Sequence, residues 1–115
     1  MNYDLEERTA KFGEDIVHCC KKIHQDAITR PLLSQLVRSA TSIGANYMEA
    51  NSASSKKDFR NKIFICKKEA QETKHWIRLL DHTFPELSLK LFWQEAHELT
   101  MIFQKITSTI DKSKH

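Results

Sequence analysis

The residues with the clearest chemical potential form a Glu-x-x-His sequence, Glu72-Thr73-Lys74-His75. Helical bundles that hold a di-iron centre use two such elements together with two further inward-facing glutamates. This chain has no second one, and its nearest approximations are Asp15 with His18 and Glu95 with His97. Side chains two residues apart diverge on a helix, so Glu95 and His97 cannot bind the same metal ion. We therefore expect no metal site and no cofactor.

Nucleophilic and phosphate-cradling chemistry is equally poorly supported. None of the serines lies in a Gly-x-Ser-x-Gly elbow. The two glycines, Gly13 and Gly44, are too far apart to build a glycine-rich phosphate loop. The three cysteines include no Cys-x-x-Cys pair, which is typical of reduced cysteines that pack as small apolar side chains. The sequence predicts no catalytic residue, and a protein that is not an enzyme.

Charge gives a more specific signal, because cations gather in one stretch. Residues 54–82 have a net charge of +4, whereas residues 1–27 have a net charge of −2. Arg60, Lys67 and Lys74 repeat every seven residues, so they share one face of a helix. With their neighbours they would form a basic stripe about 30 Å long, given the helical rise of about 1.5 Å per residue. The residues predicted to bind nucleic acid are Lys56, Lys57, Arg60, Lys67, Lys74 and Arg78.

Two interpretations of this stripe remain open. Phosphates of a nucleic acid bind a row of cations through counterion release, with weak sequence preference because phosphate contacts carry no base information. The alternative is an ordinary solvated helix face. Symmetric self-association would repeat the stripe and raise its local field, which favours nucleic-acid binding if the protein is an oligomer.

The spacing of the apolar residues predicts the helices that position these groups. Apolar residues recur at alternating steps of three and four, as in packed helical bundles, over 5–23, 33–47, 59–84 and 89–110. Asp4 and Ser55 are suited to cap the first and third helices, and Pro31 is suited to open the second. Pro85 ends the third helix or opens the fourth. We predict one all-α domain over 1–115, an up-down-up-down antiparallel four-helix bundle of helices of about 20 to 27 residues with a frayed tail over 111–115.

The second predicted helix is unusually poor in charge. Between Pro31 and Ala53 only Arg38 and Glu49 are charged, although 29% of the whole sequence is charged. A helix of this kind is expected to be covered on more than one side. A second line of mostly small or polar residues runs beside its apolar stripe, and we predict this line as the oligomer interface; the alternative is a polar face exposed to solvent. The line consists of Ser39, Ser42, Asn46, Glu49 and Ala53.

Arg38 also suggests how two of the helices keep their register. Glu69 and Glu72 lie off the apolar stripe of the third helix. If the second and third helices are neighbours, Arg38 can pair with these carboxylates. We interpret the three residues as a structural ion pair rather than as catalytic groups.

The sequence contains no recognisable targeting segment. Its first twelve residues, MNYDLEERTAKF, lack the basic and then apolar regions of a signal peptide, and no apolar stretch reaches the length of about 18 residues that a membrane span needs. We expect a cytoplasmic protein without a membrane partner.

The segment LSQLVRSATSIGANYMEANSASSKKDF, followed by KKEAQETKHWIRLL, resembles the bacterial four helix bundle protein family, also called the 23S rRNA intervening-sequence protein family. The resemblance covers roughly residues 12–99. Ala50 stands where many relatives have Gly, and Gly44 where many have Pro. The motifs that carry it are Gln35-Leu36-x-Arg38-Ser39-Ala40, Ser42-Ile43-x-Ala45-Asn46-x-x-Glu49-Ala50 and Glu69-Ala70-x-Glu72-Thr73.

This resemblance implies an antiparallel bundle that assembles as a ring-like homopentamer and has no established catalytic activity. A similar group, the accessory variability proteins of diversity-generating retroelements, forms basic pentamers that work with a reverse transcriptase and its RNA. By analogy of fold and charge, a reverse transcriptase-like partner is a further expectation. We predict a non-enzymatic oligomeric protein that binds RNA or an RNA–protein complex through the basic face of the third helix. The alternative is a structural adaptor that binds a protein partner and has no nucleic-acid role.

Overall fold

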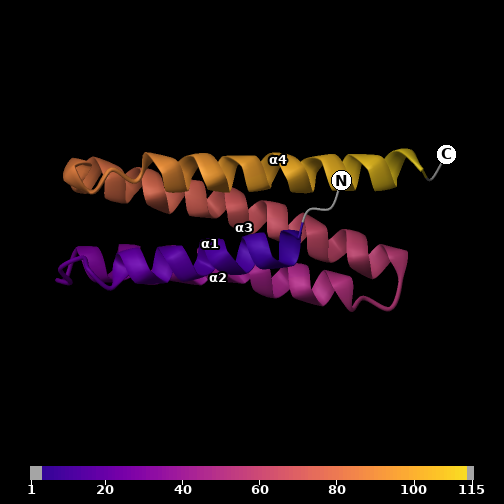
Figure 1. The fold of residues 1–115 in the computed structure, drawn as a ribbon, viewed down its shortest axis with the longest axis horizontal. Coiled ribbons are helices and arrows are strands. Elements are labelled where there is room, and N and C mark those ends of the chain that lie inside the picture. The colour runs from indigo at the N-terminus through magenta and orange to yellow at the C-terminus, as the bar shows by residue number, and fades with distance from the viewer. Residues whose placement is uncertain (1–3, 114–115) are drawn as a thin grey trace.

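The computed structural model describes residues 4–113, in which all regular secondary structure is helical. Within these residues, the four long helices of the chain lie side by side along one axis (Figure 1). The prediction of an all-α fold is confirmed. The elements are α1 (Leu5–Cys20), α2 (Thr29–Asn51), α3 (Lys56–Thr83), the short 3-10 helix η1 (Pro85–Leu87) and α4 (Lys90–Lys112).

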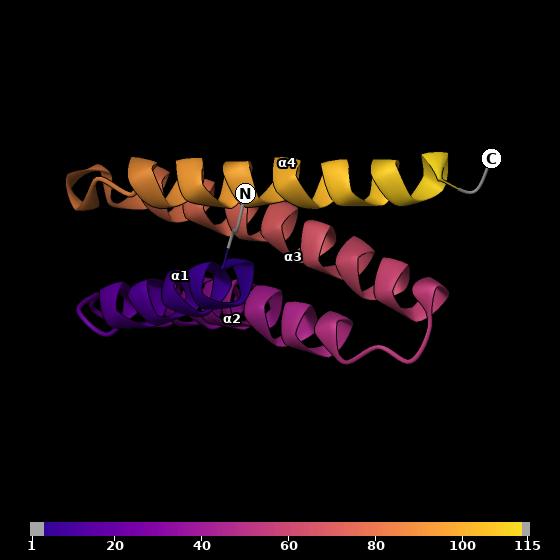
Figure 2. The same cartoon turned by 45° about the vertical axis from the view of Figure 1, so that its right-hand side comes forward.

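Consecutive helices run antiparallel, and each long helix packs against the next one along the chain (Figures 1 and 2). The α2–α3 contact is the most extensive, α1 lies against α2, and α4 lies against α3. The described part of the chain forms a rod of 50 × 23 × 21 Å. The predicted up-down-up-down four-helix bundle is therefore confirmed, and the contact between α1 and α4 is its sparsest side.

An ion pair spans this sparse side. Arg8 on α1 donates from Nε and Nη2 to the two carboxylate oxygens of Glu95 on α4, at 2.7 and 2.8 Å, and also reaches Glu98 at 3.2 Å. The hydrogen bond to Glu95 raises the pKa of Arg8 against the opposing effect of its partial burial. Such a bidentate pair fixes orientation as well as distance, so it holds α1 against α4 where apolar contact is limited.

Side-chain caps start two of the long helices. Asp4 accepts a hydrogen bond from the Glu7 N–H at 3.0 Å, and Ser55 accepts one from the Asp58 N–H at 3.0 Å, as their positions predicted. The start of α2 differs from the expectation near Pro31. Asp26 accepts from the N–H groups of Ile28 and Thr29, at 2.9 and 2.8 Å, and α2 already begins at Thr29.

The other boundaries follow equally local causes. α1 ends at Cys20 and is 16 residues long, shorter than predicted, because the chain turns there while Ile23 still reaches the core. Pro85 opens η1 rather than α4, and Ser88, with φ of 52°, reverses the chain before α4 begins. Of the predicted tail, 111–112 belong to α4, and 114–115 lie outside the described residues.

The core is formed by the predicted apolar stripes, and within it α2 packs against both α1 and α3. Because α1 covers one side of α2 and α3 covers another, its low charge is largely explained within a single chain. Two hydroxyls are also buried between α2 and α3, where Thr73 donates to Ser39 at 2.8 Å. The fully buried large apolar side chains are Ile16, Ile43, Ile63, Ile77, Leu80, Leu99 and Phe103.

The cysteines are part of this packing. All three are free thiols, and Cys20 and Cys66 are buried. Burial raises the pKa of Cys66 to about 12 and that of Cys20 to about 11. Both therefore remain protonated at neutral pH, where a thiol is a poor nucleophile.

Candidate nucleic-acid interface

The predicted basic stripe lies along the line where α3 meets α4, which we call the α3–α4 seam. Arg60, Lys67 and Lys74 do share one face of α3, but that face borders α4 and each side chain is half-buried. The expectation of an uncovered face is therefore wrong for these three residues. The heptad spacing identified a common side of the helix, but it could not show which neighbour lies there.

Each of these cations is held by a side chain of α4. Arg60 donates to both carboxylate oxygens of Asp111, at 2.6 and 2.9 Å. Lys67 donates to Gln104 Oε1 at 2.5 Å, and Lys74 to His97 Nδ1 at 3.2 Å.

The chemical nature of these partners decides how much charge the seam keeps. Asp111 compensates Arg60, and its hydrogen bonds raise the pKa of that guanidinium. Gln104 is an amide and His97 an imidazole, so neither brings a negative charge to the lysine that it contacts. At the end of the seam, Lys56 donates to the Ser113 hydroxyl at 3.2 Å, again a neutral partner. Three lysines are thus positioned without being neutralised.

Two predicted phosphate ligands lie at the edges of the seam. Lys57 and Arg78 are exposed, at the beginning and near the end of α3. All six predicted residues therefore belong to one elongated region, although only part of it is open to solvent. Lys90, Lys105 and Lys112 of α4 were not included in the sequence prediction, and all three are exposed.

One end of the seam carries an aromatic group that sequence reasoning did not assign to the interface. Trp93 is 37% exposed, and the ring of His97 stacks on it at 5.2 Å between centroids and 9° between planes. The Nζ atom of Lys74 lies 5.3 Å from the centroid of the same indole. Trp76 differs, because it packs against the core and donates its indole N–H to Glu72 at 3.3 Å. Trp93 stands beside the apolar stripe rather than within it, and this position was the feature of the sequence that could have assigned Trp93 to the interface.

The ion pair expected between α2 and α3 is present. Arg38 donates to both oxygens of Glu69, at 3.2 and 3.3 Å, and to Glu72 through a further short contact. Partial burial raises the pKa of Glu72, but the hydrogen bonds from Arg38 and Trp76 outweigh it, so the pKa is lowered overall. The hydrogen bond to Glu72 raises the pKa of Arg38.

These contacts also account for the Glu-x-x-His sequence. Glu72 is engaged by Arg38 and Trp76, while His75 meets the Trp76 ring edge-on at 5.0 Å and 67°. The two potential ligands therefore have separate structural partners. Within residues 4–113, no three His, Cys, Asp or Glu side chains gather in a way that could hold a metal ion.

The five residues of the predicted oligomer interface do not form one open face. Ser39 is 0% exposed and is bonded to Thr73, so its placement on an outer face is wrong. Ser42 and Asn46 direct their polar groups to carbonyls of their own helix, at 2.6 and 2.8 Å. Glu49 accepts from Lys62 of α3 at 2.5 Å. Ala53 is half-buried beyond the end of α2.

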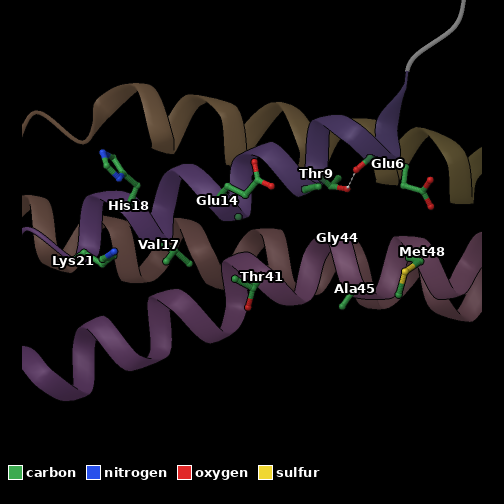
Figure 3. Close-up of a pocket in the computed structure, with 12 residues that line it drawn as sticks. Glu6, Thr9, Glu14, Val17, His18, Lys21, Thr41, Gly44, Ala45 and Met48 are labelled. Atoms are coloured by element: carbon green, nitrogen blue, oxygen red, sulfur yellow. Dashed lines mark hydrogen bonds between the residues drawn. The ribbon is translucent and has the colours of Figure 1, made fainter.

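The uncharged outer surface of α2 is found elsewhere, in a groove of 580 Å³ between α1 and α2. Figure 3 shows its two walls, with Glu6 and Glu14 along α1, Lys21 just beyond the end of α1, and Ala45 and Met48 along α2. At each of two positions in this groove a glycine faces the other helix, where a Cβ would be in ordinary van der Waals contact with it. A Cβ on Gly44 would lie 3.4 Å from Thr9, and a Cβ on Gly13 would lie 3.5 Å from Thr41.

Comparisons with known proteins support one family. The family model described as 23S rRNA-intervening sequence protein matches residues 1–83. A crystal structure of a protein of unknown function from the S23 ribosomal protein family of Bacteroides thetaiotaomicron is similar, with a TM-score of 0.78 and 31% sequence identity. The similarity covers 89% of this chain and 96% of that one. A comparison with curated proteins finds no match.

The length and apolar character of the helices decide whether any of them could cross a membrane. Among residues 4–113, none of them combines the length and the apolar character that a membrane crossing demands.

Proposed function

Because the chain belongs to the 23S rRNA-intervening sequence protein family, we propose that it is a non-enzymatic helical-bundle protein that binds RNA, or an RNA–protein complex, along the α3–α4 seam. The observation that carries this proposal is the pairing of seam lysines with neutral acceptors. Lys56, Lys67 and Lys74 are held in place by Ser113, Gln104 and His97 and keep their full charge. Positioned cations of this kind bind the phosphates of a nucleic acid and thereby release the counterions condensed on that nucleic acid.

The geometry favours a polymer over a small anion. The cations are spread along most of α3, from Lys56 to Arg78, and α4 carries the exposed Lys90, Lys105 and Lys112. A single phosphate would engage only one or two of these groups, whereas a nucleic-acid backbone can follow all of them. Phosphate contacts alone would give weak sequence preference.

Self-association belongs to the same proposal. We propose a homo-oligomer, a homopentamer by resemblance to the family, in which each subunit contributes one α3–α4 seam. Ser42, Asn46 and Glu49, together with the uncharged outer surface of α2 at Ala45 and Met48, are the residues available for the contact. Repetition of the seam would raise the affinity for RNA through multivalency without any new type of contact.

Light scattering in the presence and absence of a structured RNA tests the proposal. We expect a mass above that of one 13.5 kDa chain, and a further increase when RNA is added. The RNA-dependent increase should weaken strongly when salt is raised from about 50 to about 200 mM, because counterion release drives the binding. A monomer that is indifferent to RNA would overturn both parts of the proposal.

The groove between α1 and α2 favours a second candidate, an adaptor that binds a protein partner. Glu6 and Glu14 line the groove above a floor of small side chains, so a basic amphipathic helix is the occupant that its shape and charge suit. If this candidate is correct, Ala45→Arg should abolish capture of a basic amphipathic peptide, and RNA binding should be absent. RNA binding that survives Ala45→Arg would support the α3–α4 seam instead.

A further inference from the structure

The exposed indole at one end of the α3–α4 seam lies beside a second cavity. This cavity has a volume of 220 Å³ and is lined by Ile77, Arg78, Asp81, Leu89, Lys90 and Trp93. We propose that it binds a single base of single-stranded RNA by stacking on Trp93. The inference rests on the proposed RNA binding and deepens it, because it specifies unpaired RNA and one nucleotide subsite.

Trp93 contacts another side chain and also lines the cavity. His97 lies one helical turn further along α4 and stacks on the indole, and Lys74 reaches the same imidazole. The cavity extends in the other direction, toward Leu89 and Lys90 of the preceding turn. The indole is thus held by His97 and Lys74, and it also lines an open cavity in which a planar group could stack against it.

The chemistry of the lining distinguishes a base from a phosphate. Ile77 and Leu89 supply apolar contact, while the half-buried carboxylate of Asp81 lies between α3 and the start of α4, 3.4 Å from the Leu89 N–H. A carboxylate repels a phosphate but accepts a hydrogen bond from the exocyclic amino group of a base. The exposed Arg78 and Lys90 belong to the same lining, and their charges suit the phosphates on either side of the bound nucleotide.

The size of the cavity and the access to it further restrict the class of ligand that can bind there. Its 220 Å³ lies below the roughly 300 to 1,000 Å³ of pockets that enclose drug-sized ligands, so a single ring system fits better than a whole cofactor. In a duplex both faces of each base are already stacked, whereas unpaired bases can be splayed onto an aromatic side chain. Uracil can donate only from its ring N3–H, whereas cytosine, adenine and guanine each carry an exocyclic amino group, so we expect Asp81 to favour these three bases over uracil.

Fluorescence of a single-tryptophan protein tests the subsite. In the Trp76→Phe variant, Trp93 is the only tryptophan, so its emission reports on this cavity alone. We expect short oligocytidine to quench the emission, oligouridine to quench it less, and an RNA duplex and inorganic polyphosphate to bind without quenching. Equal quenching by polyphosphate would overturn the inference, because it would show a charge effect rather than stacking.

Affinity measurements separate this inference from the proposal on which it rests. Trp93→Ala should weaken binding of oligocytidine by about 5- to 150-fold, the range for loss of one base–aromatic stack, and Trp93→Phe should restore most of it. Binding of duplex RNA should be unchanged in both variants, which also shows that they are folded. If both variants bind oligocytidine as the unmodified protein does, the subsite is wrong and the seam stands. If no RNA binds the unmodified protein, the proposed function itself is wrong.

Discussion

Arg60, Lys67 and Lys74 of the α3–α4 seam are each held by a neighbour on α4, and the charge of that neighbour decides what the cation can still do. Arg60 faces the carboxylate of Asp111, so the attraction between them competes with any phosphate. Lys67 and Lys74 face an amide and an imidazole, which orient them without compensating their charge. The same spacing in the sequence therefore produces one largely satisfied cation and two available ones.

This difference predicts the effect of removing the carboxylate. Asp111→Asn should leave Arg60 beside a neutral amide and thereby strengthen RNA binding. One additional phosphate contact would make the dependence of log K on log salt steeper by about 0.7 to 0.9. Fluorescence anisotropy of a labelled RNA over a salt series measures this slope, with Asp15→Asn on α1 as a matched control. Weaker binding of Asp111→Asn would show that Arg60 does not contact phosphate.

The Arg38 pair gives a pH-dependent stability. The pKa of Glu72 is held below its ordinary value of 4.5, so its stabilising contact is complete above that pH and is lost as the pH falls through the lowered pKa. Both partners are partly solvent-exposed, so Arg38→Ala should cost about 1 kcal/mol or less at neutral pH. Urea unfolding across this range should show the cost shrinking as the solution becomes acidic. A difference between variant and unmodified protein that stays constant below pH 4.5 would contradict this assignment.

At the scale of the helices, the apolar stripes predicted which residues are buried. They did not predict which neighbouring helix covers the residues beside each stripe. Residues one step away from a stripe face either a neighbouring helix or solvent, and the side on which each neighbour lies is set by the order of the helices around the bundle. This is why Ser39 was assigned to an outer face although it is buried against Thr73. It is also why Arg60 and Lys67 were expected to be open although they border α4.

Helix boundaries show the same division between local and distant causes. The caps at Asp4 and Ser55 depend on residues three positions away and could be predicted from the sequence. The start of α2 depends on Asp26, which belongs to the preceding connection and accepts from two backbone N–H groups beyond it. The groove between α1 and α2 and the cavity beside Trp93 each require two helices in contact, so no single periodic pattern could reveal them.

Packing between the helices should dominate stability. Ile63 on α3 is 0% exposed, so Ile63→Ala should lower the free energy of unfolding by about 2 to 5 kcal/mol through lost burial and the cavity left behind. Ile28, just before α2, is 71% exposed. Ile28→Ala should therefore change the free energy of unfolding by no more than about 0.5 kcal/mol. Chemical denaturation of the two variants compares them directly. A similar loss in both would mean that α3 is not packed as described.

At the scale of the whole molecule, charge is distributed unevenly around a rod 50 Å long. Glu95 and Glu98 of α4 pair across to Arg8 of α1, and acidic residues of α1 line the groove with α2, while most of the lysines lie along α3 and α4. The family resemblance predicted the bundle from its motifs, and the family model and the similar crystal structure agree with it. The sequence alone could not show which cations remain available, because this depends on partners nearly forty residues away, as for Lys67 and Gln104.

The most direct test of the α3–α4 seam compares two triple variants that remove the same charge. One carries Lys56→Gln, Lys67→Gln and Lys74→Gln in the seam; the control carries Lys21→Gln, Lys22→Gln and Arg30→Gln near the α1–α2 connection. RNA affinity would be measured by anisotropy between about 50 and 200 mM salt. We predict that the seam variant binds more weakly and that its slope of log K against log salt is shallower by about 2, while the control keeps nearly the original slope. Equal losses in the two variants would mean that only net charge matters and would contradict the assignment of the seam.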